Sequence, residues 1–225
     1  MYREVQLAAS AFIRDHPVAE KPGDYDTDGQ PYAMLAVGGA FWVTEGNSNQ
    51  LLRVGLDGTV TRIADLSRDH PIPTGIAPAP DGGAYVAFFT HAPYADGAAK
   101  VVAVAADGTV TDAWTGLTLV TALAVGADGA LYALEMATGV DADDPASIGP
   151  GTGTVVRRTG PDAAEEIVTG LALPVAMDFG PDGALYVAAP AFGADEGQGT
   201  ILRLVLAAGQ PIVVPTDFRS GPSCP

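Results

Sequence analysis

The chain has 225 residues, enough for one large domain or two small ones whose core needs no metal or disulfide. Its 28 glycines and 18 prolines disfavour long helices and favour short elements joined by turns. With 11 basic against 27 acidic residues, the formal net charge is −16, so nucleic acid and anionic membranes are poor partners. The single cysteine, Cys224, excludes an internal disulfide and a thiolate metal cluster.

The first 29 residues form a leader ahead of a repeated region. Residues 4–8 (EVQLA) are predicted to be the outer strand that remains from a preceding repeat, and residues 8–14 one or two helical turns. An acidic linker completes the leader. No apolar run is long enough for a signal peptide, so none is predicted in this chain.

Four segments then repeat one pattern: a short strand, a tight turn, and a second strand that carries an aromatic residue. The segments start at Pro31, Pro73, Val120 and Pro174, and their aromatic residues are Trp42, Tyr85, Tyr132 and Tyr186. Two further β-branched strands follow each segment, so every repeat is predicted to hold four antiparallel strands, A to D. Four-stranded units of roughly 45 residues are typical of β-propeller blades. We therefore expect an all-β propeller with blades at residues 30–67, 71–116, 118–170 and 172–218, followed by a tail at 219–225.

The turns predict which side of the propeller carries a site. Asp-Gly and Gly-Gly pairs, clearest at Asp81, Asp128 and Asp182, join strands A and B, because these residues suit the positive φ of a tight hairpin. The B–C loops are longer and are predicted to share the opposite face with the D–A crossovers. They cover residues 45–50, 88–100, 136–154 and 189–200. Function concentrates in variable loops on a rigid scaffold, so we expect a site on the B–C face.

The amino-acid sequences of the repeats resemble those of a known family. The segments QPYAMLA, VTEGNSNQLLRVGLDGTVT, IPTGIAPAPDGGAYV and LVTALAVGADGALYALE resemble the ScyD/ScyE family of β-propeller proteins, over residues from about 25 to 204. The resemblance implies a six-bladed ring with no established activity, usually exported, and hence an extracellular or periplasmic location. Single blades such as DGALYVA also occur in NHL, strictosidine synthase-like, gluconolactonase-like (SMP-30-like) and virginiamycin B lyase-like propellers.

Four blades leave the closure of the ring open. A closed four-bladed ring is one arrangement, since propellers of four blades exist. The other is an open arc of a longer ring, which we favour because residues 4–8 resemble a leftover outer strand. Such an arc exposes blade flanks and favours self-association through them.

Two glutamates are the first candidates for chemistry. Glu45 and Glu135 end strand B in their blades, where side chains approach the mouth of the central tunnel. Paired carboxylates there can bind Ca²⁺ or Mg²⁺, or act as acid and base; the alternative is a pair of solvated strand ends. His91, in the second B–C loop near Tyr94, is the histidine best placed to join them, against the alternative of an ordinary surface histidine.

Other polar residues complete the expected site. Asp24, Asp26 and Asp28 alternate before Gly29 as in the start of a calcium loop, but position twelve is Leu35, so this is a weak metal candidate beside a solvated linker. Tyr32 is expected at the tunnel mouth, where its ring and hydroxyl can hold a ligand. The full set of predicted ligand-binding residues is Tyr32, Glu45, Asn47, Thr74, His91, Tyr94, Thr121 and Glu135.

These features support two classes of function. The first is a non-catalytic binding or accessory propeller, without a cofactor, that holds a small molecule or a protein on the B–C loop face. The second is a metal-assisted lyase or hydrolase, lactonase-like or virginiamycin B lyase-like, that works through Glu45, His91 and Glu135. The resemblance to gluconolactonase-like propellers implies a ligand cage that takes its asparagines from separate blades. This chain has only two asparagines, Asn47 and Asn49, both in one loop, which counts against such a cage. A third possibility is a truncated gene product with no function of its own.

Overall fold

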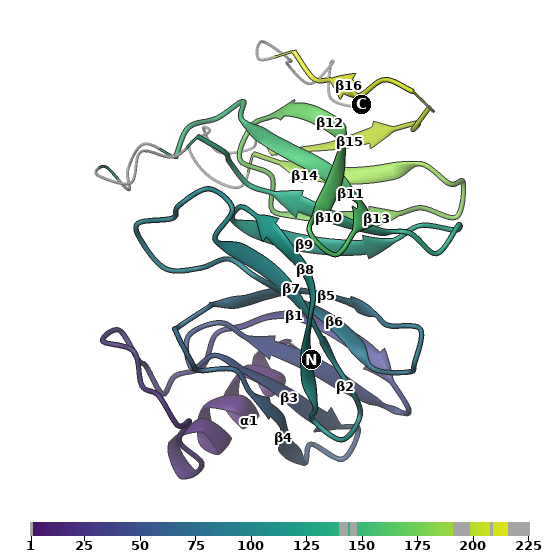
Figure 1. Cartoon of the computed structure of the whole chain (residues 1–225). Helices are drawn as coiled ribbons and strands as arrows, with labels where there is room; N and C mark the ends of the chain where they lie inside the picture. The colour runs from purple at the N-terminus through teal and green to yellow at the C-terminus, as the bar shows by residue number, and fades with distance from the viewer. Residues whose placement is uncertain (1, 140–143, 145–147, 191–198, 208, 216–225) are drawn as a thin grey trace. The chain divides into compact units, whose positions relative to one another are not determined.

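The computed structural model describes residues 2–139, 144, 148–190, 199–207 and 209–215 (Figure 1). The predicted tail at 219–225 lies outside these residues. The chain forms two compact units, one made of Met1–His91 with Ala99–Thr115, the other of Ala92–Ala98 with Gly116–Pro225. All strands but one pair antiparallel, and the sheets are the four blades of a β-propeller fold, as predicted.

The first unit contains two four-stranded blades. The first blade runs in the order β1 (Pro31–Val37), β2 (Ala40–Glu45), β3 (Gln50–Gly55) and β4 (Val60–Asp65). The second has β5 (Pro73–Pro78), β6 (Ala84–Phe88), β7 (Ala99–Val104) and β8 (Val110–Leu117), whose last two residues belong to the second unit. Both blades follow the predicted A-to-D order.

The two blades bury a shared apolar core. Trp42 and Leu51 from the first blade pack with Val86 and Val102 from the second. Alternate residues of a strand point to opposite faces, so each strand sends one apolar row into this core. The hydroxyl of Thr44 in β2 also donates to the carbonyl oxygen of Thr74 in β5, at 2.6 Å, which joins the blades by a buried hydrogen bond.

The leader differs from the prediction. Helix α1 spans Tyr2–Asp15, so residues 4–8 are helical and are not the outer strand of a preceding blade (Figure 1). Ala9 and Ile13, four residues apart, are fully buried and pack against Leu52 of β3. A helix places residues i and i+4 on one face, so this packing selects the helical period over the alternation of a strand. Residues 4–8 therefore give no support to an open arc.

The second unit contains the other two blades. The third blade has β9 (Val120–Val125), β10 (Leu131–Glu135), β11 (Gly153–Gly160) and β12 (Ala163–Leu171), and the fourth has β13 (Ala176–Phe179), β14 (Leu185–Ala189) and β15 (Thr200–Leu204). Their shared core includes Leu134 and Val168 from the third blade and Leu185 and Val187 from the fourth.

The outer strand of the fourth blade corrects a second prediction. Residues 212–213 form β16, which pairs in parallel with β12 of the third blade instead of antiparallel with β15. The third sheet therefore has five strands and the fourth has three. Val214, which follows β16, is only 9% exposed and packs in the core with Val168 and Leu171. The burial of this valine on the third blade favours that edge over β15.

The predicted register and turns are otherwise confirmed. Tyr85, Tyr132 and Tyr186 each occupy the second position of strand B in their blades. The carboxylates of Asp81 and Asp128 accept the backbone N–H two residues ahead at 3.0 Å, as in an Asx turn. Within the described residues, no helix combines the length and hydropathy needed to cross a lipid bilayer.

Candidate functional site

Glu45 is buried and its carboxylate is held by the first B–C loop. One oxygen accepts the backbone N–H groups of Gln30, at 2.5 Å, and Asn47, at 3.3 Å. The other accepts the N–H of Ser48 at 2.6 Å, together with the hydroxyl of the same serine. A carboxylate without solvent exposure and with four donors around it caps the loop, and the two donors of Ser48 would otherwise be buried without this partner.

Glu135, at the same position in the third blade, has a similar role. It accepts the backbone N–H of Thr118 at 2.7 Å and the hydroxyl of Thr154 at 2.8 Å. Burial raises the pKa of its carboxyl, and the negative charges of Asp96 and Glu166 add to that increase, while the two hydrogen bonds oppose it. Both glutamates thus hold the chain around their strand ends. The expectation that they lie near each other stays a prediction.

The predicted tunnel-mouth residues differ in exposure. Thr74 and Thr121 are each 3% exposed. The hydroxyl of Thr74 lies 3.3 Å from the carbonyl oxygen of Ala87. The hydroxyl of Thr121 lies 3.3 Å from the carbonyl oxygens of both Leu134 and Pro174. Tyr32 is 45% exposed on β1 and so remains accessible. Tyr94 belongs to the second unit, where its φ of 58° places it in the left-handed region.

The aspartates of the leader lie beside the first B–C loop. The side chain of Asn47 links the two segments: its Oδ1 accepts the N–H of Asp26 at 2.5 Å, and its Nδ2 donates to the carbonyl oxygen of Asp24 at 3.0 Å. Asp26 Oδ1 also accepts the N–H of Asp28 at 3.0 Å. In the described part of the chain, no group of three or more His, Cys, Asp or Glu side chains is arranged to hold a metal.

A histidine that the sequence did not single out contacts both the leader and the first B–C loop. His70, in the crossover between β4 and β5, has Nε2 at 3.2 Å from Asp24 Oδ1 and Nδ1 at 2.8 Å from Asn49 Nδ2. The oxygen of the Asn49 amide accepts the N–H of Ile72 at 2.7 Å, so its nitrogen faces the ring. His70 Nδ1 is therefore an acceptor, and neutral His70 carries its proton on Nε2 toward Asp24.

His91 stacks against His70, with ring centroids 5.6 Å apart and an angle of 23° between the planes. Its Nδ1 lies 3.2 Å from the carbonyl oxygen of His70. A carbonyl oxygen only accepts, so this nitrogen carries a proton, and in the neutral ring of exposed His91 the lone pair is on Nε2. We call Asp24, Asn47, Asn49, His70 and His91 the histidine cluster. All five lie in the first unit.

The backbone around the histidine cluster is held in unusual conformations. Ile72 and Thr90, both β-branched, have φ of 55° and 75°, and Asn49 and His70 are also left-handed. Such residues cost of order 1–3 kcal/mol each and persist where their surroundings hold them. Here the N–H groups of Phe89 and Thr90 donate to the carbonyl oxygens of Ile72 and Pro71, at 2.9 and 2.8 Å. The crossover and the second B–C loop thus fix each other, and within this unit they share a side as predicted.

Of the histidine cluster, the predicted ligand-binding residues include His91 and Asn47 but not His70 or Asn49. The available signal was the repeat itself, because it already placed the D–A crossover that holds His70 on the same face as the B–C loops.

The comparisons with known proteins support the fold. No family model and no curated protein sequence matches the chain. Among solved structures it is similar to virginiamycin B lyase from Staphylococcus aureus, at 17% identity and a TM-score of 0.53, over 83% of this chain and 59% of the lyase. It is also similar to a PQQ-bound aldose sugar dehydrogenase from Streptomyces coelicolor (17%, TM-score 0.59, 77% and 59%). A third is a protein assigned as a gluconolactonase (15%, TM-score 0.54, 78% and 63%).

These structures define the class to which the fold belongs. All three are β-propellers, and so is this chain. The chain spans about three fifths of the length of each. Identities of this size establish the fold alone, and the activities of the three proteins differ from one another.

Proposed function

We propose that this chain is a non-catalytic binding propeller of the ScyD/ScyE type, with its ligand or partner held at the histidine cluster on the B–C loop face. The proposal includes the extracellular or periplasmic location that the family resemblance implies. One observation carries it: Glu45 and Glu135, the two acids expected to do chemistry, have oxygen atoms occupied by the chain's own N–H and hydroxyl groups. An acid already engaged in this way is poorly suited to bind a cation or to exchange protons with a substrate.

The histidine cluster offers acceptors rather than a complete catalytic set. Asp24 is exposed, and His91 carries a lone pair on Nε2. The hydrogen bonds of Asn49 and the strained crossover hold these groups before any ligand arrives, and a site that is ordered in advance loses less entropy on binding. The chemistry therefore suits a molecule or partner group that donates hydrogen bonds.

A ligand screen by NMR tests the binding part of the proposal. The probes are small amides, ureas and amidines, and the readout is the imidazole Cε1–H signals of the three histidines. His16, directly after helix α1 and with Nδ1 at 3.1 Å from the carbonyl oxygen of Phe12, is the internal reference. Probes that bind the cluster shift the signals of His70 and His91 and leave His16 in place. Shifts of all three alike, or of none, would contradict the proposal.

An activity assay separates this function from the enzymatic alternative. Quinupristin and glucono-1,5-lactone are incubated with the protein, with and without Mg²⁺ or Ca²⁺. We expect no turnover above that of the buffer. Turnover that disappears in Glu45→Gln or in Glu135→Gln would establish the lyase or hydrolase alternative instead.

A further inference from the structure

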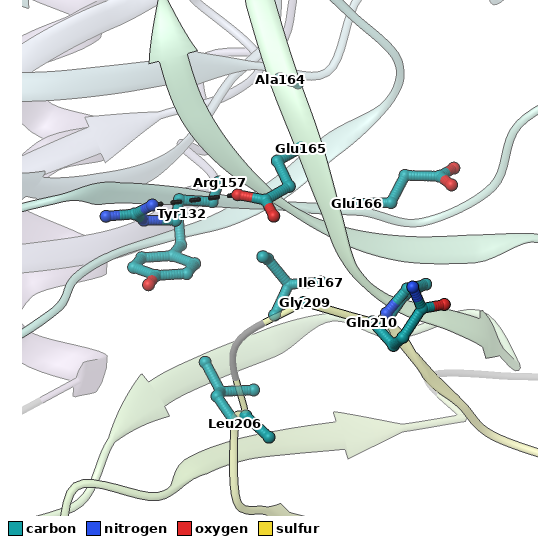
Figure 2. Close-up of a pocket in the computed structure, with 11 residues that line it drawn as sticks. Tyr132, Arg157, Ala164, Glu165, Glu166, Ile167, Leu206, Gly209 and Gln210 are labelled. Atoms are coloured by element: carbon teal, nitrogen blue, oxygen red, sulfur yellow. Dashed lines mark ion pairs between the residues drawn. The ribbon is translucent and has the colours of Figure 1, made fainter.

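A pocket of 630 Å³ lies in the second unit, along the outer strand of the third blade (Figure 2). Residues 164–167 of β12 form one wall, and residues 206, 207 and 209–211, which lead into β16, form the other. Tyr132 and Arg157 also line it. The pocket is separate from the histidine cluster, which belongs to the first unit.

The edge of a strand forms the first wall. Four consecutive residues of β12 line the pocket, although alternate side chains of a strand point to opposite faces of the sheet. Consecutive residues meet one space only where the edge of the strand faces it. Within the described residues, β16 pairs with this edge only at Val168 and Thr169, so the edge at 164–167 has no neighbouring strand there.

The side chains around this edge are acidic and apolar. The guanidinium of Arg157 is 2.9 Å from Asp128 and 3.8 Å from Glu165, so its charge is already matched. Figure 2 shows Glu165 turned toward Arg157 and the carboxylate of Glu166 directed away from it. Ile167, Leu206 and Pro211 add apolar surface to the walls. Among the described residues that line the pocket, Glu165 and Glu166 carry two negative charges against the one positive charge of Arg157, beside apolar contacts.

We propose that the edge of β12 at residues 164–167 binds an extended peptide that contains lysine or arginine, as an additional strand in this pocket. Backbone N–H and C=O groups of the peptide pair with β12, which is how strand addition to a sheet edge provides affinity. β16 already pairs with the same edge at the next two residues, Val168 and Thr169, so the edge accepts a strand. A basic side chain of the peptide contacts Glu166, and the apolar side chain next to it in the peptide contacts Ile167 and Leu206.

The size of the wall matches a short peptide. The four residues of β12 that form the wall span about 13 Å, so an extended peptide of four residues covers its whole length. An acidic peptide is disfavoured by Glu165 and Glu166. A compact cation without a backbone makes the charge contact and forgoes the strand pairing.

Three acetylated and amidated peptides test this inference: KVKV, KVKV with both valines N-methylated, and EVEV. Each is titrated into ¹⁵N-labelled protein of full length, and amide shifts are followed. We expect KVKV to shift the amides of residues 164–167. N-methylation removes the backbone N–H donors of the two valines, and we expect it to weaken binding at least tenfold. EVEV is expected not to bind at the same concentrations.

A pair of protein variants isolates the local charge. Glu166→Gln is expected to weaken KVKV about threefold, a change typical of one partly exposed ion pair. Asp69→Asn removes the same unit of charge from the exposed loop of the first unit, and we expect the affinity of KVKV to stay unchanged. Equal affinity for both forms of KVKV would overturn strand pairing. Shifts centred elsewhere, or equal losses in the two variants, would overturn the assignment to this edge.

Discussion

The attachment of β16 to the third blade depends on one glycine. Gly170 has a φ of 81°, and a Cβ built on it would overlap the carbonyl oxygen of Val214 and lie 3.4 Å from its nitrogen. The equivalent Gly116 stands in the same Thr-Gly-Leu sequence with a φ of 78° and has no described atom within 4 Å of such a Cβ. Gly170→Ala and Gly116→Ala therefore share the cost of a left-handed alanine, and only the first adds the overlap.

The magnitudes indicate what each variant will do. A left-handed alanine costs about 1–2 kcal/mol, so both variants are expected to lose about that much in the free energy of unfolding. Burial of Val214 contributes about 2 kcal/mol, and its N–H bond to Thr169 at 2.9 Å about 1 kcal/mol. Ordering residues 212–214 costs about 1–2 kcal/mol for each residue. These contributions nearly cancel, so the attachment is marginal and an overlap of one methyl group is enough to release it.

Urea unfolding and amide hydrogen exchange measure the two effects separately. We expect both variants to lose a similar amount of stability, and only Gly170→Ala to lose the exchange protection of the Val214 amide. Wild-type protection of that amide in Gly170→Ala would refute the reasoning. Loss of protection in Gly116→Ala would show that backbone strain alone, without the overlap, releases the strand.

Three further predictions concern single side chains. Burial raises the pKa of Glu135 in the folded state, so its favourable contribution is present below the unfolded pKa of about 4.3 and is lost as pH rises through the folded value. Urea titrations should show that Glu135→Gln gains stability relative to wild type from pH 4 to 7, and a constant difference would contradict this. The hydrogen bond from Arg203 lowers the pKa of Asp182, so its contribution is present above the unfolded pKa and is lost as pH falls through the folded value. Asp182→Asn should thus lower Tm at pH 7 more than Asp81→Asn does, because the blade of Asp81 has an alanine at the position equivalent to Arg203. Equal shifts in Tm would contradict this prediction. Leu51→Ala opens a cavity in the first core and is expected to cost about 2–5 kcal/mol by urea unfolding; a loss below 1 kcal/mol would mean that the core collapses around it.

Local chemistry accounts for the parts that sequence predicted well. The blade pattern could be predicted because the alternation of apolar residues and the Asp-Gly turns act between residues close in the chain. Tyr85 and Tyr132 share a register for that reason, and Asp81 and Asp128 close the same kind of turn. The faces of the loops also followed, since strand order alone decides which connections share an end of the sheet.

Candidate site residues were harder to place because their partners are distant in sequence. A glutamate at the end of a strand has the same local pattern whether it faces a ligand or caps a loop. Only the fold brings the N–H group of Gln30, 15 positions earlier in the chain, to Glu45. Likewise, Asp24 and His70 are 46 positions apart, and nothing in either segment indicates that the leader passes the crossover.

Packing supports the helix and decides the place of the last strand. Residues 4–8 are mostly helix formers (Glu4, Gln6, Leu7 and Ala8), and burial of Ala9 and Ile13 on Leu52 adds tertiary support for the helical period. Residues 212–213 are β-branched and form a strand wherever an edge is offered, so sequence determines that they are extended. Tertiary structure determines which edge they join, because Gly170 in the third blade leaves room for the backbone of Val214, whose side chain is buried in the core with Val168 and Leu171.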